Sequence, residues 1–122
     1  MAEAKTVYVI DDDSALSAAY SLALSNLGYT VRAASDGVEG VALLKNGLPA
    51  AILLDILMPN LDGYNFLKQL RADPAAKDVK VIVVSNFEAP LGIEKLGVAK
   101  YLSKMQNSPE AVAAVVDRLL KA

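Results

Sequence analysis

Residues 6–13 read TVYVIDDD, five β-branched or aromatic residues followed by three aspartates. A short run of this kind predicts a buried strand that ends in acidic residues. Residues 50–55, AAILLD, repeat the pattern with one aspartate at the end, and residues 80–85, KVIVVS, end in a serine. Strands that are apolar on both faces are typical of a parallel sheet covered by helices on both sides. These three runs therefore predict the centre of such a sheet.

The segments between and beyond these runs predict helices and two further strands. A helix is expected to follow an N-cap at Asp13-Ser14, to reach Asn26, and to end at the C-cap Gly28. Pro109 suits the first position of the last helix. The other expected elements are strands at 29–33 and 100–103, helices at about 37–46 and 63–72, and a weak helix between 90 and 96.

Strands and helices alternate five times along the chain, which predicts an α/β fold with a five-stranded parallel sheet. Because crossovers between parallel strands are right-handed, the sheet should be doubly wound, with helices on both faces. A strand order of 2-1-3-4-5 would place the switch point between the first and third strands. The chain has 122 residues, so we expect a single domain over residues 1–122.

The composition excludes several kinds of function. Without cysteine or histidine, the chain cannot form a disulfide, a zinc site built on those ligands, or a Cys–His or Ser–His–Asp catalytic group. Any metal must be bound by oxygen, which favours Mg²⁺, Mn²⁺ or Ca²⁺. A net charge of −2 with interspersed acids and bases argues against direct nucleic-acid binding.

The apolar runs are also far shorter than the roughly 20 residues that span a bilayer. The first residues, MAEAK, show no apolar region of a signal peptide. We therefore expect a cytoplasmic protein that does not insert into a membrane.

Acidic residues follow the two strands that flank the expected switch point. Asp11 and Asp12 follow the first strand, and Asp55 follows the third. Neighbouring strands lie about 4.8 Å apart, so these carboxylates should converge on one pocket, within reach of the long side chain of Lys104 after the fifth strand. Converging carboxylates repel one another unless a cation compensates, and so small a cluster suits Mg²⁺.

A pocket of carboxylates with a cation and a lysine is suited to phosphoryl transfer, which depends on positioning and charge neutralisation. Asp55 is the best candidate for the nucleophile, since it stands alone after its strand while Asp11 and Asp12 can hold the metal. Asp13 and Asp62 are interpreted as helix caps rather than as site residues.

The acidic strand ends belong to a set of motifs that resembles the receiver domain of bacterial response regulators. The resemblance covers residues 5–120. Its motifs stand at successive strand ends: VIDDD at 9–13, LLD at 53–55 with MP at 58–59 and DG at 62–63, VVS at 83–85, and G at 97 with YLSK at 101–104. These blocks in this order are far more specific than any single acidic pair.

The resemblance implies a flavodoxin-like receiver fold and a phosphorylation site. Asp55 would be the phosphoacceptor. Asp12, Asp55 and the backbone carbonyl of Leu57 would bind Mg²⁺ or Mn²⁺, and Asp11 would help directly or through water.

The resemblance also implies how the site would work as a switch. Lys104 would contact the phosphoryl oxygens, Ser85 would hydrogen-bond the phosphoryl group, and Tyr101 would turn inward when Ser85 moves. The donor would be a histidine kinase or a phosphotransfer protein. The output would be a changed surface on the fourth helix, fifth strand and fifth helix, which binds a downstream protein target. Such a domain catalyses its own phosphorylation and dephosphorylation but is not a conventional turnover enzyme.

Three features depart from the family pattern. Met105 follows Lys104 where the family usually has proline, and we expect the peptide bond before it to be trans, because a cis bond would cost about 2.5–4 kcal/mol. Asn86-Phe87 replaces a small residue after Ser85. The stretch from 85 to 101 is about one helical turn shorter than usual and contains Pro90 and Gly92, so we expect a short or irregular fourth helix.

Three other functions compete with this interpretation. The first is a binding module of the same fold that is never phosphorylated, which the altered fourth helix favours. The second is a phosphatase with an aspartate nucleophile, but such enzymes carry a second aspartate two residues later, where this chain has Leu57. The third is a nucleotide-binding flavodoxin-like domain, and no glycine-rich phosphate loop follows the first strand.

Overall fold

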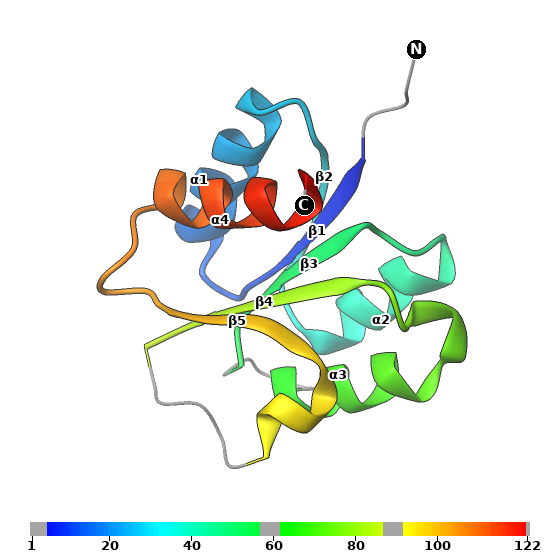
Figure 1. The fold of residues 1–122 in the computed structure, drawn as a ribbon. Coiled ribbons are helices and arrows are strands. Elements are labelled where there is room, and N and C mark those ends of the chain that lie inside the picture. The colour runs from blue at the N-terminus through cyan, green and yellow to red at the C-terminus, as the bar shows by residue number, and fades with distance from the viewer. Residues whose placement is uncertain (1–4, 57–61, 87–91, 122) are drawn as a thin grey trace.

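The computed structural model describes residues 5–56, 62–86 and 92–121. Figure 1 shows a twisted central sheet with helices packed on both of its faces. The fold is therefore the α/β architecture that the alternating sequence pattern predicted.

The sheet contains five strands in the order β2-β1-β3-β4-β5, and every neighbouring pair is parallel. This order confirms the predicted doubly wound topology and its switch point between β1 and β3. The largest difference in boundaries is in β5, which begins two residues earlier than expected. The strands are β1 (Thr6–Ile10), β2 (Thr30–Ala34), β3 (Ala51–Leu54), β4 (Lys80–Ser85) and β5 (Val98–Ser103).

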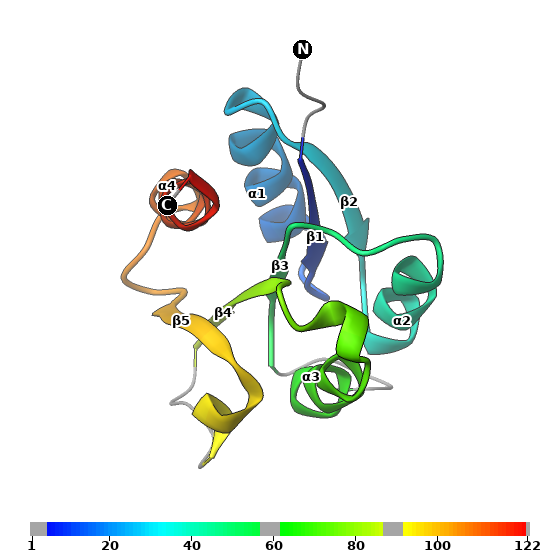
Figure 2. The ribbon, with the colours of Figure 1, turned by 45° about the vertical axis from the view of Figure 1, so that its right-hand side comes forward.

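The helices form one layer on each face of the sheet. They are α1 (Ser14–Asn26), α2 (Gly37–Lys45), α3 (Gly63–Ala72) and α4 (Pro109–Lys121), with short 3₁₀ helices η1 (Pro74–Ala76) and η2 (Ile93–Leu96). Helices α1 and α4 cover one face, and α2 and α3 cover the other (Figures 1 and 2). Within the described ranges, no helix is both long enough and apolar enough to cross a membrane.

Successive residues of each strand point into opposite layers of the core, because the side chains of a strand alternate between the two faces. In β1, Val9 packs with Tyr20 of α1 and Val116 of α4. Its neighbour Ile10 packs on the other side with Phe66 of α3. The strands are thus buried on both faces, which explains why they are apolar throughout.

Aspartates are the N-cap residues of the first three α-helices. Asp13, Asp36 and Asp62 each precede a helix and accept a hydrogen bond from a backbone N–H in its first turn. The interaction satisfies an amide that has no partner within the helix. The interpretation of Asp13 and Asp62 as helix caps is confirmed.

The expected fourth helix is a single 3₁₀ turn in the described part of the chain. Residues Ile93–Leu96 form η2, flanked by Gly92 and Gly97 with φ angles of 84° and 71°. Both glycines adopt the left-handed conformation that other residues avoid, so they bound the turn sharply. The prediction of a short element is confirmed here, while Phe87 and Pro90 lie outside the described residues. The C-terminal helix is consequently labelled α4.

A tyrosine ties α4 to the start of β2. The Tyr29 hydroxyl donates a 2.5 Å hydrogen bond to Oδ1 of Asp117, and Nζ of Lys121 lies 3.3 Å from Oδ2 of the same carboxylate. Burial, together with this hydrogen bond and the negative charge of Asp117, raises the pKa of Tyr29 from 10.0 to about 12. The hydrogen bond from Tyr29 is the largest cause that lowers the pKa of Asp117.

Because of Tyr29, the free energy of unfolding should fall as the pH is raised into the alkaline range. A group whose pKa is higher in the folded state stabilises the fold fully below its unfolded pKa, and this contribution is lost as the pH rises toward about 12. Tyr29→Phe should lower the melting temperature by a few degrees at neutral pH, and the difference from the unsubstituted chain should vanish near pH 12. Thermal unfolding followed by circular dichroism checks this, with Tyr64→Phe as the control. A difference that is the same at both ends of this pH range would contradict the prediction.

Candidate functional site

The acidic residues leave β1 and β3 at the same edge of the sheet. The last residues of the two strands, Ile10 and Leu54, are partners in the parallel register. The N–H of Asp55 donates a 2.9 Å hydrogen bond to the carbonyl of Ile10, which continues the pairing one step further. This pairing brings Asp11 and Asp55 out of neighbouring strands side by side.

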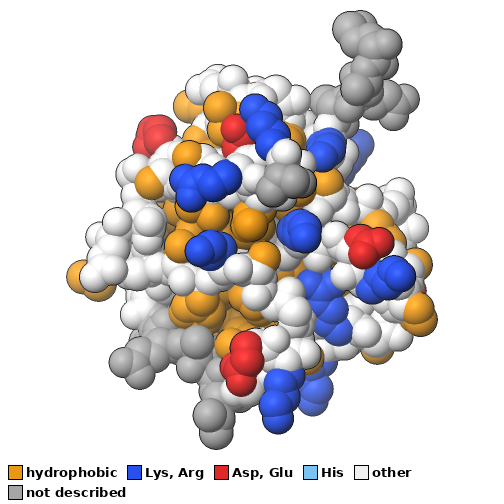
Figure 3. All heavy atoms as spheres, viewed as in Figure 1, with side chains coloured by type: hydrophobic (Ala, Val, Ile, Leu, Met, Phe, Trp, Pro, Cys, Tyr) orange, Lys and Arg blue, Asp and Glu red, His pale blue; other side chains and the backbone are white. Residues whose placement is uncertain are grey.

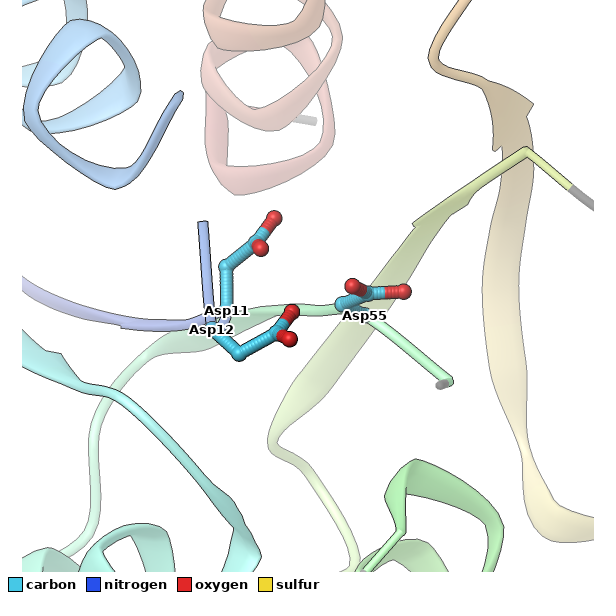
Figure 4. A group of neighbouring side chains, drawn as sticks. All are labelled: Asp11, Asp12 and Asp55. Carbon is cyan, nitrogen blue, oxygen red and sulfur yellow. The ribbon is translucent and has the colours of Figure 1, made fainter. Parts of the chain in front are cut away.

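Asp11, Asp12 and Asp55 form one cluster of carboxylates. One oxygen from each lies within 4.8 Å of an oxygen of the others. Figure 4 shows the three side chains extending beyond the strand ends into the same region. Asp11 and Asp55 are only 4% and 6% exposed, whereas Asp12 is exposed to solvent. The predicted convergence of these three residues is therefore observed.

The backbone fixes the position of Asp11. Its N–H donates to the carbonyl of Ala34 at the end of β2 (3.1 Å), and its Oδ1 accepts a hydrogen bond from the N–H of Asp13 (2.9 Å). The second bond holds the carboxylate in one orientation, with Oδ2 directed at Lys104.

Lys104 reaches the cluster from the far side of β4. Its Nζ lies 3.0 Å from Oδ2 of Asp11 and 3.0 Å from Oδ2 of Asp55. Burial lowers the pKa of Lys104, but the hydrogen bonds and ion pairs with Asp55 and Asp11 outweigh this effect, so the pKa is raised overall. The ammonium group is therefore charged and bridges the two buried carboxylates.

The loop after Lys104 departs from the family pattern without displacing this lysine. The N–H of Lys104 donates to the carbonyl of Ser85 (3.0 Å), which continues the pairing of β5 with β4. Among the described residues no peptide bond is cis, so the expectation of a trans bond before Met105 is confirmed. Met105 itself is 85% exposed and lies outside the site.

The structure also positions the two residues of the expected switch. Ser85 is buried at the end of β4, the strand next to β3, and it is paired in register with Ser103. Tyr101 is half-buried on β5 and packs against the core layer under α2 and α3. These positions are compatible with the expected roles, which stay predictions. Leu57, whose carbonyl was expected to bind the metal, lies outside the described residues.

A glycine packs directly against the backbone of the phosphoacceptor candidate. Gly63 begins α3, and its N–H donates a 2.8 Å hydrogen bond to the carbonyl of Ile56. A Cβ atom at this position would lie 2.4 Å from the carbonyl oxygen of Asp55. The absence of a side chain is thus what allows α3 to begin beside the site. The sequence contained this signal as an Asp-Gly pair, although the contact itself could not be read from it.

The donor set fits a hard divalent cation. Three carboxylates lie within reach of a single ion, and one of them, Asp12, is open to solvent. Proteins in general bind Mg²⁺ through one or two carboxylates and leave several of its water ligands in place. Asp11 and Asp12 also line an open cavity of about 370 Å³ between α1 and the end of β2.

The fold and the site together define a class of proteins: doubly wound α/β domains with an acidic cluster and a buried lysine at the carboxyl ends of the strands. The model of the response regulator receiver domain matches residues 7–116. The chain belongs to this family, and hence to the receiver domains of two-component systems.

Similar proteins agree with this assignment. The sensor histidine kinase CheAY of Helicobacter pylori is 37% identical over 121 residues, which cover 94% of this chain and 15% of that protein. The DNA-binding dual master transcriptional regulator RpaA of Synechocystis sp. is 37% identical over 113 residues, 89% of this chain and 46% of that protein. The chain thus spans less than half the length of these curated relatives.

Solved structures match over almost their whole length. A putative response regulator from Chloroflexus aurantiacus is 27% identical with a TM-score of 0.84, and the match covers 98% of this chain and 99% of that one. The receiver domain of the Francisella response regulator 1452 is 30% identical with a TM-score of 0.83, and the match covers 96% and 97%.

Proposed function

We propose that this domain accepts a phosphoryl group on Asp55 with the help of Mg²⁺ or Mn²⁺. The observation that carries the proposal is the position of Asp55. Its carboxylate is buried at the switch point, lies in a cluster with Asp11 and Asp12, and is 3.0 Å from the ammonium of Lys104. Membership of the receiver family supports the same chemistry.

In the proposed reaction, a carboxylate oxygen of Asp55 attacks the phosphorus atom of the donor. A P–O bond to Asp55 forms as the bond to the leaving group breaks, and the leaving group takes the electron pair. Asp11, Asp12 and Asp55 would hold the metal, with the Leu57 carbonyl as a further ligand. The metal supplies positive charge that neutralises the phosphoryl oxygens. Lys104 adds a second positive charge, which is already fixed in place by its two ion pairs.

The phosphorylated state would then differ from the free state by new contacts. A phosphoryl group carries up to two negative charges and three acceptor oxygens, and it can bias a two-state equilibrium through them. We infer that Ser85 hydrogen-bonds these oxygens and that Tyr101 moves inward in response. The donor would be a histidine kinase or phosphotransfer protein in the cytoplasm, and the altered surface would bind a downstream protein. The domain would act as a switch and not as a turnover enzyme.

Incubation with Mg²⁺ and acetyl phosphate tests the proposal. We expect the mass of the intact protein to increase by one phosphoryl group, and we expect no increase for Asp55→Ala or in the presence of EDTA. The matched control is Asp62→Asn, because asparagine caps a helix as well as aspartate does. This control should be phosphorylated normally.

The results would also separate the competing functions. A folded protein that takes up no phosphoryl group would overturn the proposal and favour a binding module that works without phosphorylation. Repeated turnover of a phosphate ester would instead indicate a phosphatase.

A further inference from the structure

Arg71 binds backbone carbonyls at the end of the sheet where β4 and β5 begin, opposite the end that carries the acidic site. It lies in the last turn of α3, and its guanidinium donates four hydrogen bonds, all to neutral backbone carbonyls. Nε donates to Leu96 (2.8 Å) and Nη1 to Ala76 (2.9 Å). Nη2 donates to both Val79 (2.9 Å) and Gly97 (3.0 Å). One side chain therefore joins α3 to the segments that lead into β4 and β5.

The two carbonyls that share Nη2 stand directly before two neighbouring strands. Val79 precedes the first residue of β4, and Gly97 precedes the first residue of β5. A guanidinium is planar and its donors are fixed in direction, unlike the rotating ammonium of a lysine. Because one nitrogen contacts both carbonyls, the guanidinium fixes the register in which β5 begins to pair with β4.

The contact with Arg71 requires a glycine at position 97. Its φ of +71° is in the left-handed region, and a Cβ atom there would lie 3.2 Å from Nε of Arg71 and 3.4 Å from Cζ. Glycine is thus favoured twice, by the backbone conformation and by the space that the guanidinium occupies. Arg71 and Gly97 form a single structural unit, which we call the β5 clasp.

An irregularity in the sheet follows immediately after the clasp. Val81 of β4 pairs with Val98 of β5, but the next residue, Ile82, pairs with Lys100. Ala99 is therefore one extra residue in β5, a β-bulge, and it shifts the pairing of everything that follows by one position.

The shifted register decides which side chain faces the acidic cluster. Beyond the bulge the strands pair in step as far as Ser85 and Ser103, and the N–H of Lys104 then bonds to the carbonyl of Ser85. Successive side chains of a strand point to opposite faces, so a slip of one residue would replace Lys104 by a neighbour. That neighbour would be Ser103 or Met105, and neither could supply a charge to Asp11 and Asp55.

We propose that Arg71 is a positioning residue for the candidate site, acting from the opposite end of the sheet. The β5 clasp sets the start of β5, the bulge at Ala99 takes up the extra residue, and Lys104 consequently reaches Asp11 and Asp55. The consequence for phosphoryl uptake rests on the proposed function, whereas the consequence for the placement of Lys104 does not.

The first test is made without a phosphodonor. In ¹⁵N NMR spectra, the Nζ group of Lys104 should give a protected ammonium signal, and its backbone amide should exchange slowly with solvent. Arg71→Gln should weaken both, and Arg71→Lys should give an intermediate effect because a lysine donates to fewer carbonyls. Lys68→Gln, an exposed residue of the same helix, is the control that removes the same charge. If Arg71→Gln does not fold, Gly97→Ala replaces it in this test, because the added Cβ would crowd the guanidinium of Arg71 and disturb the same contact.

The second test compares phosphorylation rates with acetyl phosphate in saturating Mg²⁺. We expect Arg71→Gln to react about tenfold more slowly than the unsubstituted protein, which is within the roughly 100-fold that a 1 Å misplacement at a reacting centre can cost. In a Lys104→Met background, the same substitution should cost almost nothing, because both changes act through one lysine. If Arg71→Gln instead acted independently of Lys104, the rate losses of the two substitutions would multiply in the double variant.

Each outcome decides the proposal. An unchanged Lys104 signal in folded Arg71→Gln, or rate losses that multiply, would overturn it. If the unsubstituted protein takes up no phosphoryl group, the proposed function fails, and the NMR comparison still decides the role of Arg71.

Discussion

Gly63→Ala is expected to destabilise the domain by about 3 kcal/mol, the upper range for forcing atoms into a packed site. Alanine is normally the better helix former, so propensity alone predicts the opposite sign. The added Cβ would lie 2.4 Å from the carbonyl oxygen of Asp55 and 2.6 Å from Cα of Ile56. These are backbone atoms, which cannot rotate away as the end of a side chain can. Either α3 or the segment that carries Asp55 must move.

Gly40→Ala is the matched control for this substitution. Its Cβ would also be crowded, at 2.9 Å from Ile10 Cδ1 and 2.9 Å from Phe66 Cε2, but both are ends of side chains. We expect a cost of about 1 kcal/mol or less, since repacking is offset by the better helix propensity. Urea unfolding measures both variants, and acetyl phosphate measures whether Asp55 has moved. Equal losses in the two variants would contradict this explanation.

The order of strands and helices could be predicted because each central strand is a separate apolar run. A parallel sheet buries both faces of its strands, so the signal is a continuous stretch such as residues 50–54, close to the observed β3 at Ala51–Leu54. The start of β5 was predicted two residues late. Val98 follows the left-handed Gly97 and pairs with Val81, and the bulge at Ala99 directly after it leaves no mark in the apolar pattern.

Contacts between side chains and distant backbone could not be predicted in the same way. Tyr8 was read as part of a buried strand, which is correct, since it is 4% exposed. Its hydroxyl lies 2.5 Å from the carbonyl oxygen of Gly47, just after α2, and 3.2 Å from that of Leu43 in the last turn of α2, so its single proton is shared between the two acceptors. The Leu43 carbonyl also accepts a 3.0 Å hydrogen bond from the N–H of Asn46, so the tyrosine is an additional partner at the end of the helix. Arg71 plays a similar part for β5 and was missed for the same reason, because its partners are backbone atoms and leave no pattern in the sequence.

The candidate site was predictable to the extent that topology alone places it. Asp11, Asp55 and Lys104 follow parallel strands at the same edge, so any sequence with this strand order must bring them close together. The difference between Asp11 and Asp12 was beyond sequence reasoning. Consecutive residues point in different directions, and it is the three-dimensional structure that buries Asp11 against Lys104 while Asp12 faces solvent.

Lys104→Met is expected to lower the free energy of unfolding by about 3 kcal/mol in metal-free buffer, because breaking a buried ion pair leaves a charge without compensation. The side chains of Lys104, Asp11 and Asp55 are only 10%, 4% and 7% exposed. Methionine retains most of the apolar stem of lysine, so the loss should reflect the missing charge rather than a cavity. Lys100→Met, a solvent-exposed substitution on the same strand, is the control and should change stability little.

Mg²⁺ should recover much of this loss if the acidic cluster binds it. An ion that binds only the folded state stabilises it by mass action, and the variant should bind the ion more tightly because no ammonium competes for the same carboxylates. Added Mg²⁺ should therefore raise the melting temperature of Lys104→Met more than that of the unsubstituted protein or of Lys100→Met. Phosphoryl uptake from acetyl phosphate should still fall by about 100-fold, since the metal cannot replace a fixed positive charge aimed at the transferring group. Equal responses to Mg²⁺ in all three proteins would show that the ion does not bind where Lys104 bridges Asp11 and Asp55.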